Sequence, residues 1–419
     1  MSKHKLYSRN FFILLFSVCF PFLMTSCIDG PNDPQKHKGP AQSTLLIYAV
    51  ATNSLTGNLV SDKNEMLKVA KDIDLSSNNV LIFETQYKYL EDYTRVGNVR
   101  LLKLAKAQDA DGYTWETVKD FNDGVASLDP SRVSEIITYV KENFEAENYG
   151  LVFWSHSTAS QPYFDDTAKT ETYNINPQTY SVSLPMQYSF GQDLTVSAGD
   201  PYYQINVDVL ADAIPDNMFN FIWFDSCYMS NIETIYQFRN KCKTYVGYPT
   251  EVLDDGLPYH YVLPYMVGRN PDLVHAAELF FNYYSNSFGT IAVVDTENLE
   301  NLVDFCKGYY GKHNISSSSI MKYSRYSTGP FYDFGDYSKA MGSGSGNEIP
   351  EEEWNKILEQ CVLYKATTSG SLLGLSIKAD RFSGISTHLY SFLEEGSEIK
   401  ESMNEKYYKS LDWYKAVFE

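Results

Sequence analysis

Continuous apolar runs of strand length recur along this chain, and segments with helical spacing separate them. The runs "TLLIYAVA", "LVFW" and "FNFIWF" lack the polar alternation of a half-exposed strand, which indicates that both faces of each strand are buried. A strand is buried on both faces only where other elements cover its sheet from both sides. The pattern therefore predicts an α/β fold, with a mostly parallel sheet covered by helices on each side.

Helical segments and further strands lie between these runs. A helix is predicted over 129–149, with Asp129 or Ser131 as its cap and Gly150 just past its end. The polar stretch 157–204 predicts a long loop with hairpins. The second half of the chain is less regular, and its late strands are predicted at "LLGLSI" and "GISTHLY".

Composition and charge limit the classes of function. The chain is 43% hydrophobic and 15% aromatic, which is enough to bury a substantial core. Its formal charge of -19 argues against binding to nucleic acid or to anionic membranes, because phosphate contacts need clustered Lys and Arg. The charge is compatible with solubility and with cationic peptide substrates.

The first 27 residues have the basic start and short apolar middle of a secretory signal. They end in "LMTSC", which resembles a bacterial lipobox and implies that Cys27 carries lipid. An exported protein anchored by lipid in the cell envelope is therefore expected, attached to the membrane but not spanning it. The alternative is an ordinary cleaved signal in which Cys27 is incidental. Residues 28–43 are predicted to be a flexible tether, and the folded domain to span 44–419.

Four cysteines lie outside the signal, namely Cys227, Cys242, Cys306 and Cys361. No Cys-x-x-Cys pair or Cys/His cluster occurs, so a metal site is not predicted. The sequence leaves disulfides and free thiols among these cysteines as open alternatives.

Two of the predicted strands end in reactive residues. His156 follows "LVFW" after one serine, and Cys227 follows "FNFIWF" after Asp-Ser. Ligands bind outside the carboxyl ends of the strands in a parallel sheet, so the two side chains emerge at one edge if the strands run in the same direction. A thiol at the start of a helix, with a histidine base, fits acyl transfer by a Cys-His dyad. The alternative is that each residue is ordinary core packing.

The blocks "LVFWSHS" and "FIWFDSC" resemble those of clan CD cysteine peptidases, which end one apolar strand in His-Gly and another in an acid, a small residue and Cys. From about residue 44 onward, the chain more narrowly resembles the clostripain family. The nucleophile block "FDSCYMSNIETIYQF" carries the most specific part of this resemblance. The resemblance implies a caspase-like α/β/α sandwich, with a catalytic core at 44–250 and an extension at 251–419 packed on it.

The resemblance also assigns roles to residues of this chain. Cys227 would be the nucleophile and His156 the general base, with the backbone N–H groups of Ser157 and Cys227 binding the oxyanion. Asp225 would lie at the floor of the S1 pocket and select peptide or protein substrates with Arg or Lys at P1. Additional negative charge for that pocket would come from the following loop, through Glu251, Asp254 and Asp255.

Ser157 departs from the family pattern, which has glycine after the catalytic histidine. Its Cβ would crowd the scissile carbonyl or disfavour the backbone angles needed there. The alternative function is therefore an inactive relative that binds peptides or a partner. Self-cleavage is expected at Lys169, the only Lys or Arg between His156 and Cys227. The family resemblance also raises calcium as a cofactor, although no calcium loop is legible.

Overall fold

The computed structural model describes residues 39–89, 95–108, 111–157, 172–175, 178–181, 189–197, 200–310, 319–323, 331–370, 374–388 and 405–419. The predicted signal with Cys27, most of the predicted tether and the self-cleavage residue Lys169 lie outside these ranges. Residues Gly39–Glu419 form one compact unit. The first strand begins at Ala41, so residues 41–43 of the predicted tether already belong to the sheet.

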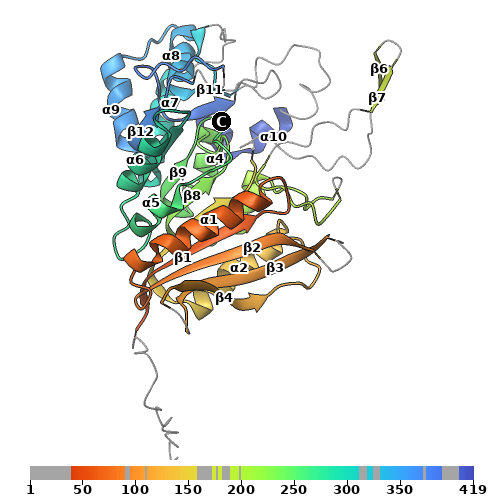
Figure 1. Ribbon diagram of the computed structural model, residues 1–419. Coiled ribbons are helices and arrows are strands. Elements are labelled where there is room, and N and C mark those ends of the chain that lie inside the picture. The colour runs from red at the N-terminus through yellow and green to blue at the C-terminus, as the bar shows by residue number, and fades with distance from the viewer. Residues whose placement is uncertain are drawn as a thin grey trace, which may run out of the picture. The chain divides into compact units, whose positions relative to one another are not determined.

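Nine strands of the described residues form one sheet, in the order β12-β10-β9-β8-β5-β1-β2-β3-β4 (Figure 1). Their bounds are β1 (Ala41–Val50), β2 (Asn78–Tyr89), β3 (Arg95–Lys106), β4 (Tyr113–Asp120), β5 (Ala146–Trp154), β8 (Phe219–Asp225), β9 (Cys242–Gly247), β10 (Thr290–Asp295) and β12 (Val362–Thr367). The central strands β9, β8, β5, β1 and β2 are parallel. Antiparallel strands flank them, β3 and β4 on one side and β10 and β12 on the other.

Helices cover both faces of this sheet. One face packs against α1 (Thr56–Val69), α5 (Tyr259–Val262) and α6 (Leu273–Tyr284). The other face packs against α2 (Pro130–Asn143), α3 (Val207–Asp212), α4 (Ile232–Gln237), α7 (Leu299–Tyr309), α8 (Phe334–Gly344), α9 (Glu351–Cys361) and α11 (Asp412–Phe418), which follows α10 (Glu405–Ser410). Two separate buried apolar clusters result, one on each face. The predicted α/β/α arrangement is confirmed, because strands with two apolar faces require two covering layers.

Two strand pairs stand apart from the main sheet. β6 (Thr172–Ile175) and β7 (Gln178–Ser181) form a hairpin within the polar stretch where hairpins were predicted. β11 (Phe331–Asp333) pairs antiparallel with β13 (Ser386–His388). The late strand predicted at "GISTHLY" is therefore present, but in this separate pair. The strand predicted at "LLGLSI" is wrong for its described part, since residues 374–377 form no strand.

The predicted end of the helix at Gly150 is wrong. Asp129 does cap α2, since its side chain accepts a hydrogen bond from the Ser131 N–H at 2.8 Å. The helix ends at Asn143, however, and Gly150 lies inside β5. A Cβ at Gly150 would approach ring carbons of Phe221 to 2.4 Å, so glycine here allows close packing of two neighbouring strands and does not end a helix.

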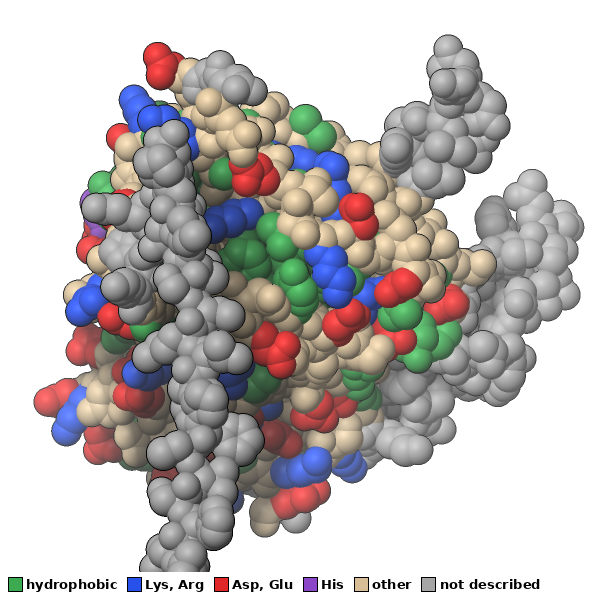
Figure 2. Space-filling model, turned by 90° about the horizontal axis from the view of Figure 1, so that it is seen from below, with side chains coloured by type: hydrophobic (Ala, Val, Ile, Leu, Met, Phe, Trp, Pro, Cys, Tyr) green, Lys and Arg blue, Asp and Glu red, His purple; other side chains and the backbone are tan. Residues whose placement is uncertain are grey.

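On the face shown in Figure 2, Lys and Arg side chains are interspersed with Asp and Glu among the described residues, rather than gathered into one basic surface. Within the described ranges, no helix has both the length and the apolar character needed to cross a bilayer.

Candidate active site

The strands that carry the two predicted catalytic residues are neighbours in the sheet. β5 pairs in parallel with β8, and Trp154 lies opposite Asp225 at their carboxyl ends. His156 lies two residues after Trp154, and Cys227 lies two residues after Asp225. Both therefore emerge at the same edge of the sheet. The hydroxyl of Ser157 donates a hydrogen bond to the backbone carbonyl of Cys227 at 2.5 Å, which keeps the two strand ends side by side beyond the sheet.

His156 is held from two directions. Its Nε2 lies 2.9 Å from the Ser54 hydroxyl in the turn after β1, and its carbonyl accepts a hydrogen bond from the Gly191 N–H at 2.8 Å. Burial lowers the pKa of His156 below its ordinary value, and Asp254 partly opposes that shift. A neutral imidazole is the form that accepts a proton, so this environment suits a general base. No sequence motif marks Ser54 as a partner of His156.

The Cys227 thiol is covered by the loop after β9. Its Sγ accepts a hydrogen bond from the Val252 N–H at 3.4 Å and lies 3.8 Å from the Val252 carbonyl oxygen. Burial raises the pKa of the thiol to about 12, and the Val252 N–H opposes that shift. Further increase comes from nearby carboxylates, those of Glu251, Asp254 and Asp225. α4 starts only at Ile232, so Cys227 lies five residues before the helix and not at its N-terminus, where the helix would favour the thiolate.

Asp225 points to the face of the sheet that α1 and α5 cover. It is 4% exposed and accepts hydrogen bonds from the Leu257 N–H and the Tyr259 hydroxyl, each at 3.2 Å, and from the Tyr248 hydroxyl at 3.4 Å. Burial raises the pKa of this carboxyl to about 7, although the three hydrogen bonds oppose the rise. Among the described residues, no Lys or Arg forms an ion pair with it.

A second buried carboxyl group lies in the same region. Asp62 of α1 is 4% exposed and accepts a hydrogen bond from the Trp154 indole N–H at 2.9 Å. Burial, and then the charge of Asp225, raise the pKa of Asp62 to about 9. Sequence reasoning missed this residue, but a signal existed. Asp62 shares the buried stripe of α1 with Leu59 and Met66, a position where an acid is unusual.

The other acids proposed for the pocket lie in the loop that leads to α5. Glu251 is half-buried, and Asp254 and Asp255 are exposed. Glu251 and Asp254 act electrostatically on Cys227, whereas Asp255 acts on Asp62. The structure thus brings all four predicted acids to one region, with Asp225 at its buried end and the loop acids toward solvent.

All four cysteines of the described residues are free thiols, and Cys242, Cys306 and Cys361 are buried. Within the described ranges, no group of three or more His, Cys, Asp or Glu side chains is arranged to hold a metal ion. The described residues do not fit a calcium site.

A sequence model of the clostripain family matches residues 47–182 and 197–419, which is most of the chain. The chain belongs to the clostripain family. Clostripain from Hathewaya histolytica is 26% identical over 208 residues, which are 47% of this chain and 36% of that protein. The chain therefore spans only about a third of the length of the curated clostripain that it matches.

Solved structures show the same fold as this clostripain-family chain. An inactive zymogen of a C11 protease from Parabacteroides distasonis has a TM-score of 0.67 and 25% identity, covering 91% of this chain and 99% of that one. A secreted C11 cysteine protease from Bacteroides thetaiotaomicron, solved with an irreversible peptide inhibitor, has a TM-score of 0.69 and 24% identity, with the same coverage. The predicted caspase-like fold class is confirmed.

Proposed function

We propose that this chain is a cysteine endopeptidase in which His156 and Cys227 cleave peptide bonds after Arg or Lys. One observation carries the proposal. The neighbouring parallel strands β5 and β8 end in register, and a hydrogen bond between Ser157 and Cys227 holds their extensions together. A histidine base and a thiol therefore lie on adjacent loops at the sheet edge where α/β proteins bind ligands.

The electrostatics favour proton transfer during attack over a preformed ion pair. Burial raises the pKa of the Cys227 thiol and lowers that of His156, and both shifts favour a neutral pair over a thiolate–imidazolium pair before attack. As Sγ attacks the scissile carbonyl carbon, His156 takes the thiol proton and the carbonyl electrons move to oxygen. His156 then gives that proton to the leaving amine as the C–N bond breaks. Water attacks the resulting thioester with His156 again as base, which releases the acid and restores the thiol.

Backbone N–H groups of Ser157 and Cys227 would stabilise the oxyanion in this mechanism. The N–H groups of Ser157 and Cys227 donate no hydrogen bond to another described residue, and they lie on the two loops that flank the reaction centre. Ser157 does not adopt a positive φ, since among the described non-glycine residues only Asn217 and Tyr228 do. The conformation observed at Ser157 therefore does not require glycine, which supports activity despite the departure from the family pattern.

The charges around Asp225 support selection of a cationic P1 side chain. Asp225 and Asp62 are two buried carboxyl groups without an ion-pair partner among the described residues, and such groups carry a desolvation cost. A guanidinium or ammonium group entering beside Asp225 would supply the missing charge. The same cation would offset the carboxylates that raise the pKa of Cys227 and would favour thiolate formation.

Export and lipid attachment at Cys27 remain part of the proposal, as does self-cleavage at Lys169. Metabolic labelling with a fatty acid tests the anchor, and failure to label wild type more than a Cys27→Ala variant would leave an ordinary signal peptide. The anchor and the peptidase activity are tested separately, because the mature domain can be assayed without lipid.

Turnover of fluorogenic peptides tests the activity. We expect the purified mature protein to cleave Arg and Lys peptides, and both Cys227→Ala and His156→Ala to lose at least about 1,000-fold in kcat/KM. Cys242→Ala is the matched control, since that thiol is buried elsewhere in the core. Absence of turnover above Cys227→Ala, with or without calcium and reductant, would overturn the proposal in favour of an inactive peptide-binding relative.

A further inference from the structure

The turn between β8 and α4 carries the Cys227 thiol and is attached on two sides. On one side, the Tyr228 N–H donates to the Thr250 carbonyl at 2.8 Å, and the Ser230 N–H donates to the Tyr248 carbonyl at 3.0 Å. These bonds tie the turn to the chain that follows β9. The other side of the turn faces residues from the C-terminal part of the chain.

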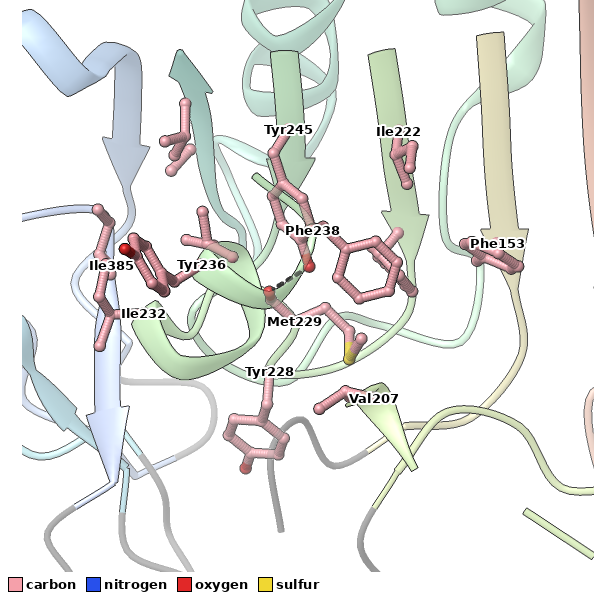
Figure 3. Packing of buried hydrophobic residues seen from close by; sticks show 14 of the residues in the cluster. Phe153, Val207, Ile222, Tyr228, Met229, Ile232, Tyr236, Phe238, Tyr245 and Ile385 are labelled. Atoms are coloured by element: carbon pink, nitrogen blue, oxygen red, sulfur yellow. Dashed lines mark hydrogen bonds between the residues drawn. The ribbon is translucent and has the colours of Figure 1, made fainter. Parts of the chain in front are cut away.

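Strand β13 and the residues before it form this second attachment. The Ser386 N–H donates to the Ser230 carbonyl at 2.8 Å, and the Ser230 hydroxyl donates to the Gly384 carbonyl at 2.8 Å. Ile385 lies beside Ile232 and Tyr236 of α4 in the same buried cluster (Figure 3). The nucleophile turn is therefore held between the chain that follows β9 and a segment far along the chain.

Tyr228, the residue directly after the nucleophile, has an unusual backbone conformation. Its φ is 62°, in the left-handed region that side-chain-bearing residues rarely adopt. Such a conformation persists only where surrounding contacts impose it. The Tyr228 ring stacks on the Phe331 ring of β11, with centroids 4.6 Å apart and planes at 16°. β11 in turn pairs with β13, so both strands of this pair support the turn.

Glu233 fastens the start of α4 to β13. It is fully buried, and its Oε1 accepts hydrogen bonds from the Thr387 hydroxyl at 2.7 Å and from the His388 N–H at 3.3 Å. The Asn231 side chain, which caps α4, lies near this carboxyl group and lowers its pKa, against the rise that burial causes. Burying a carboxyl group costs desolvation free energy. Glu233 joins the start of α4 to a distant strand, and this cost is accounted for if the geometry of the turn depends on that link.

We propose that Glu233 and Phe331 are positioning residues for Cys227, because they attach the nucleophile turn to the β11–β13 pair and so fix the direction of Sγ. This inference rests on the proposed function. Neither side chain touches the reacting atoms. Glu233 acts through β13 and the helix cap, and Phe331 acts through the Tyr228 ring. The C-terminal part of the chain is thereby a component of the site, not only a cover for the core.

The test compares variants that remove the attachment with variants that keep it. Glu233→Ala removes the acceptor for β13, whereas Glu233→Gln keeps an amide oxygen in its place. Phe331→Leu removes the ring stack and guards against a folding failure of Glu233→Ala. Glu84→Gln is the matched control, because Glu84 is also fully buried but lies in β2, paired with Lys63 and Arg100.

Two measurements are made below the melting temperature of every variant. For Glu233→Ala and Phe331→Leu, kcat should fall about 10- to 100-fold, with KM within about 3-fold, since a misdirected thiol still leaves the binding pocket intact. Iodoacetamide should alkylate Cys227 about 10-fold faster in these variants, because Val252 no longer covers Sγ. Mass spectrometry measures the rate of this alkylation. Glu233→Gln and Glu84→Gln should stay within about 3-fold of wild type in both measurements.

Wild-type rates of alkylation and of turnover in Glu233→Ala and Phe331→Leu would overturn the inference. Changes of equal size in Glu84→Gln at a matched loss of melting temperature would also overturn it, since general destabilisation would then suffice. A wild-type protein without peptidase activity would refute the proposed function alone, because the alkylation rates would still decide whether Glu233 and Phe331 position Cys227.

Discussion

The Ser157 hydroxyl donates a hydrogen bond to the Cys227 carbonyl across the ends of two neighbouring strands, at 2.5 Å. A glycine at this position, as in the family pattern, would lack that bond. Ser157 departs from the family pattern, and that departure argues against activity. The same residue nevertheless adds a direct link between the loop that carries His156 and the loop that carries Cys227. Ser157 is 8% exposed, so the bond is largely shielded from water.

Replacing Ser157 separates the role of its hydroxyl from that of its Cβ. Ser157→Ala should lower the free energy of unfolding by about 1 kcal/mol through the lost hydrogen bond. Ser157→Gly should cost about 0.5–1 kcal/mol more through backbone entropy. Urea unfolding measures both, and kcat/KM should change less than about 3-fold in either variant. A gain of 10-fold or more in Ser157→Gly would instead show that the Cβ obstructs the substrate.

Neutralising Asp225 tests the selection of a cationic P1 residue. Asp225→Asn should lower kcat/KM for Arg and Lys peptides by about 100-fold, since truncating one partner of a buried charge pair costs several kcal/mol. Kinetics on matched peptides with Arg, Lys or Leu at P1 measure this. The exposed Asp216 pairs with Lys241 away from the site, and Asp216→Asn should change little. An equal loss on the Leu peptide would assign Asp225 a structural role only.

Stability should depend on pH through Asp62. Its raised pKa, to about 9, means that the folded state keeps a proton that the unfolded chain loses above about pH 4. The contribution of Asp62 to stability is complete below that pH and is lost as the pH rises toward 9. Asp62→Asn abolishes this loss, so its stability relative to wild type should increase by roughly 1–3 kcal/mol between pH 5 and pH 8. Urea unfolding at both pH values checks it, and a difference independent of pH would contradict it.

A small guanidinium compound should activate the thiol. Carboxylates contribute to the raised pKa of Cys227, so a cation bound beside Asp225 should lower that pKa. Each unit of lowering increases the thiolate fraction about tenfold at neutral pH. We expect n-butylguanidinium to accelerate iodoacetamide labelling of Cys227 about 3- to 10-fold, while the uncharged n-butylurea has no effect. Persistence of the acceleration in Asp225→Asn would place the cation elsewhere.

Self-cleavage at Lys169 is a separate prediction about a residue outside the described ranges. Wild type should convert to two fragments on storage, and Lys169→Ala and Cys227→Ala should stay intact on a denaturing gel. Mass spectrometry of the new N-terminus identifies the cut bond. Equal persistence of wild type and Lys169→Ala as single chains would remove the proposal, whereas cutting of Cys227→Ala would point to a contaminating protease.

The sequence pattern predicted the centre of the fold and failed at its edges. Strands such as β5 and β8 are apolar on both faces, and that pattern has few other solutions. β4 was missed because its burial is low and its charged residues obscure the strand pattern. The direction of β10 could not be predicted either, because strand direction depends on how the chain connects and not on residue pattern.

The site was only partly predictable for a similar reason. His156 and Cys227 could be paired because parallel neighbouring strands bring their ends together. The sequence pattern does not reveal the contacts made by Asp62, Val252 and Glu233. Each of these contacts joins residues that are distant in sequence and lie on different elements. Asp62 was nevertheless visible in the sequence as an acidic residue within the apolar stripe of α1.

The bond between Glu233 and Thr387 joins residues 154 positions apart in the chain. During synthesis, residue 227 therefore leaves the ribosome long before the strand that supports its turn exists. A growing chain holds its nucleophile without the β11–β13 pair, and the turn acquires its final geometry only after residues 386–388 have emerged. The order of the segments alone delays assembly of the site until β13 has been made.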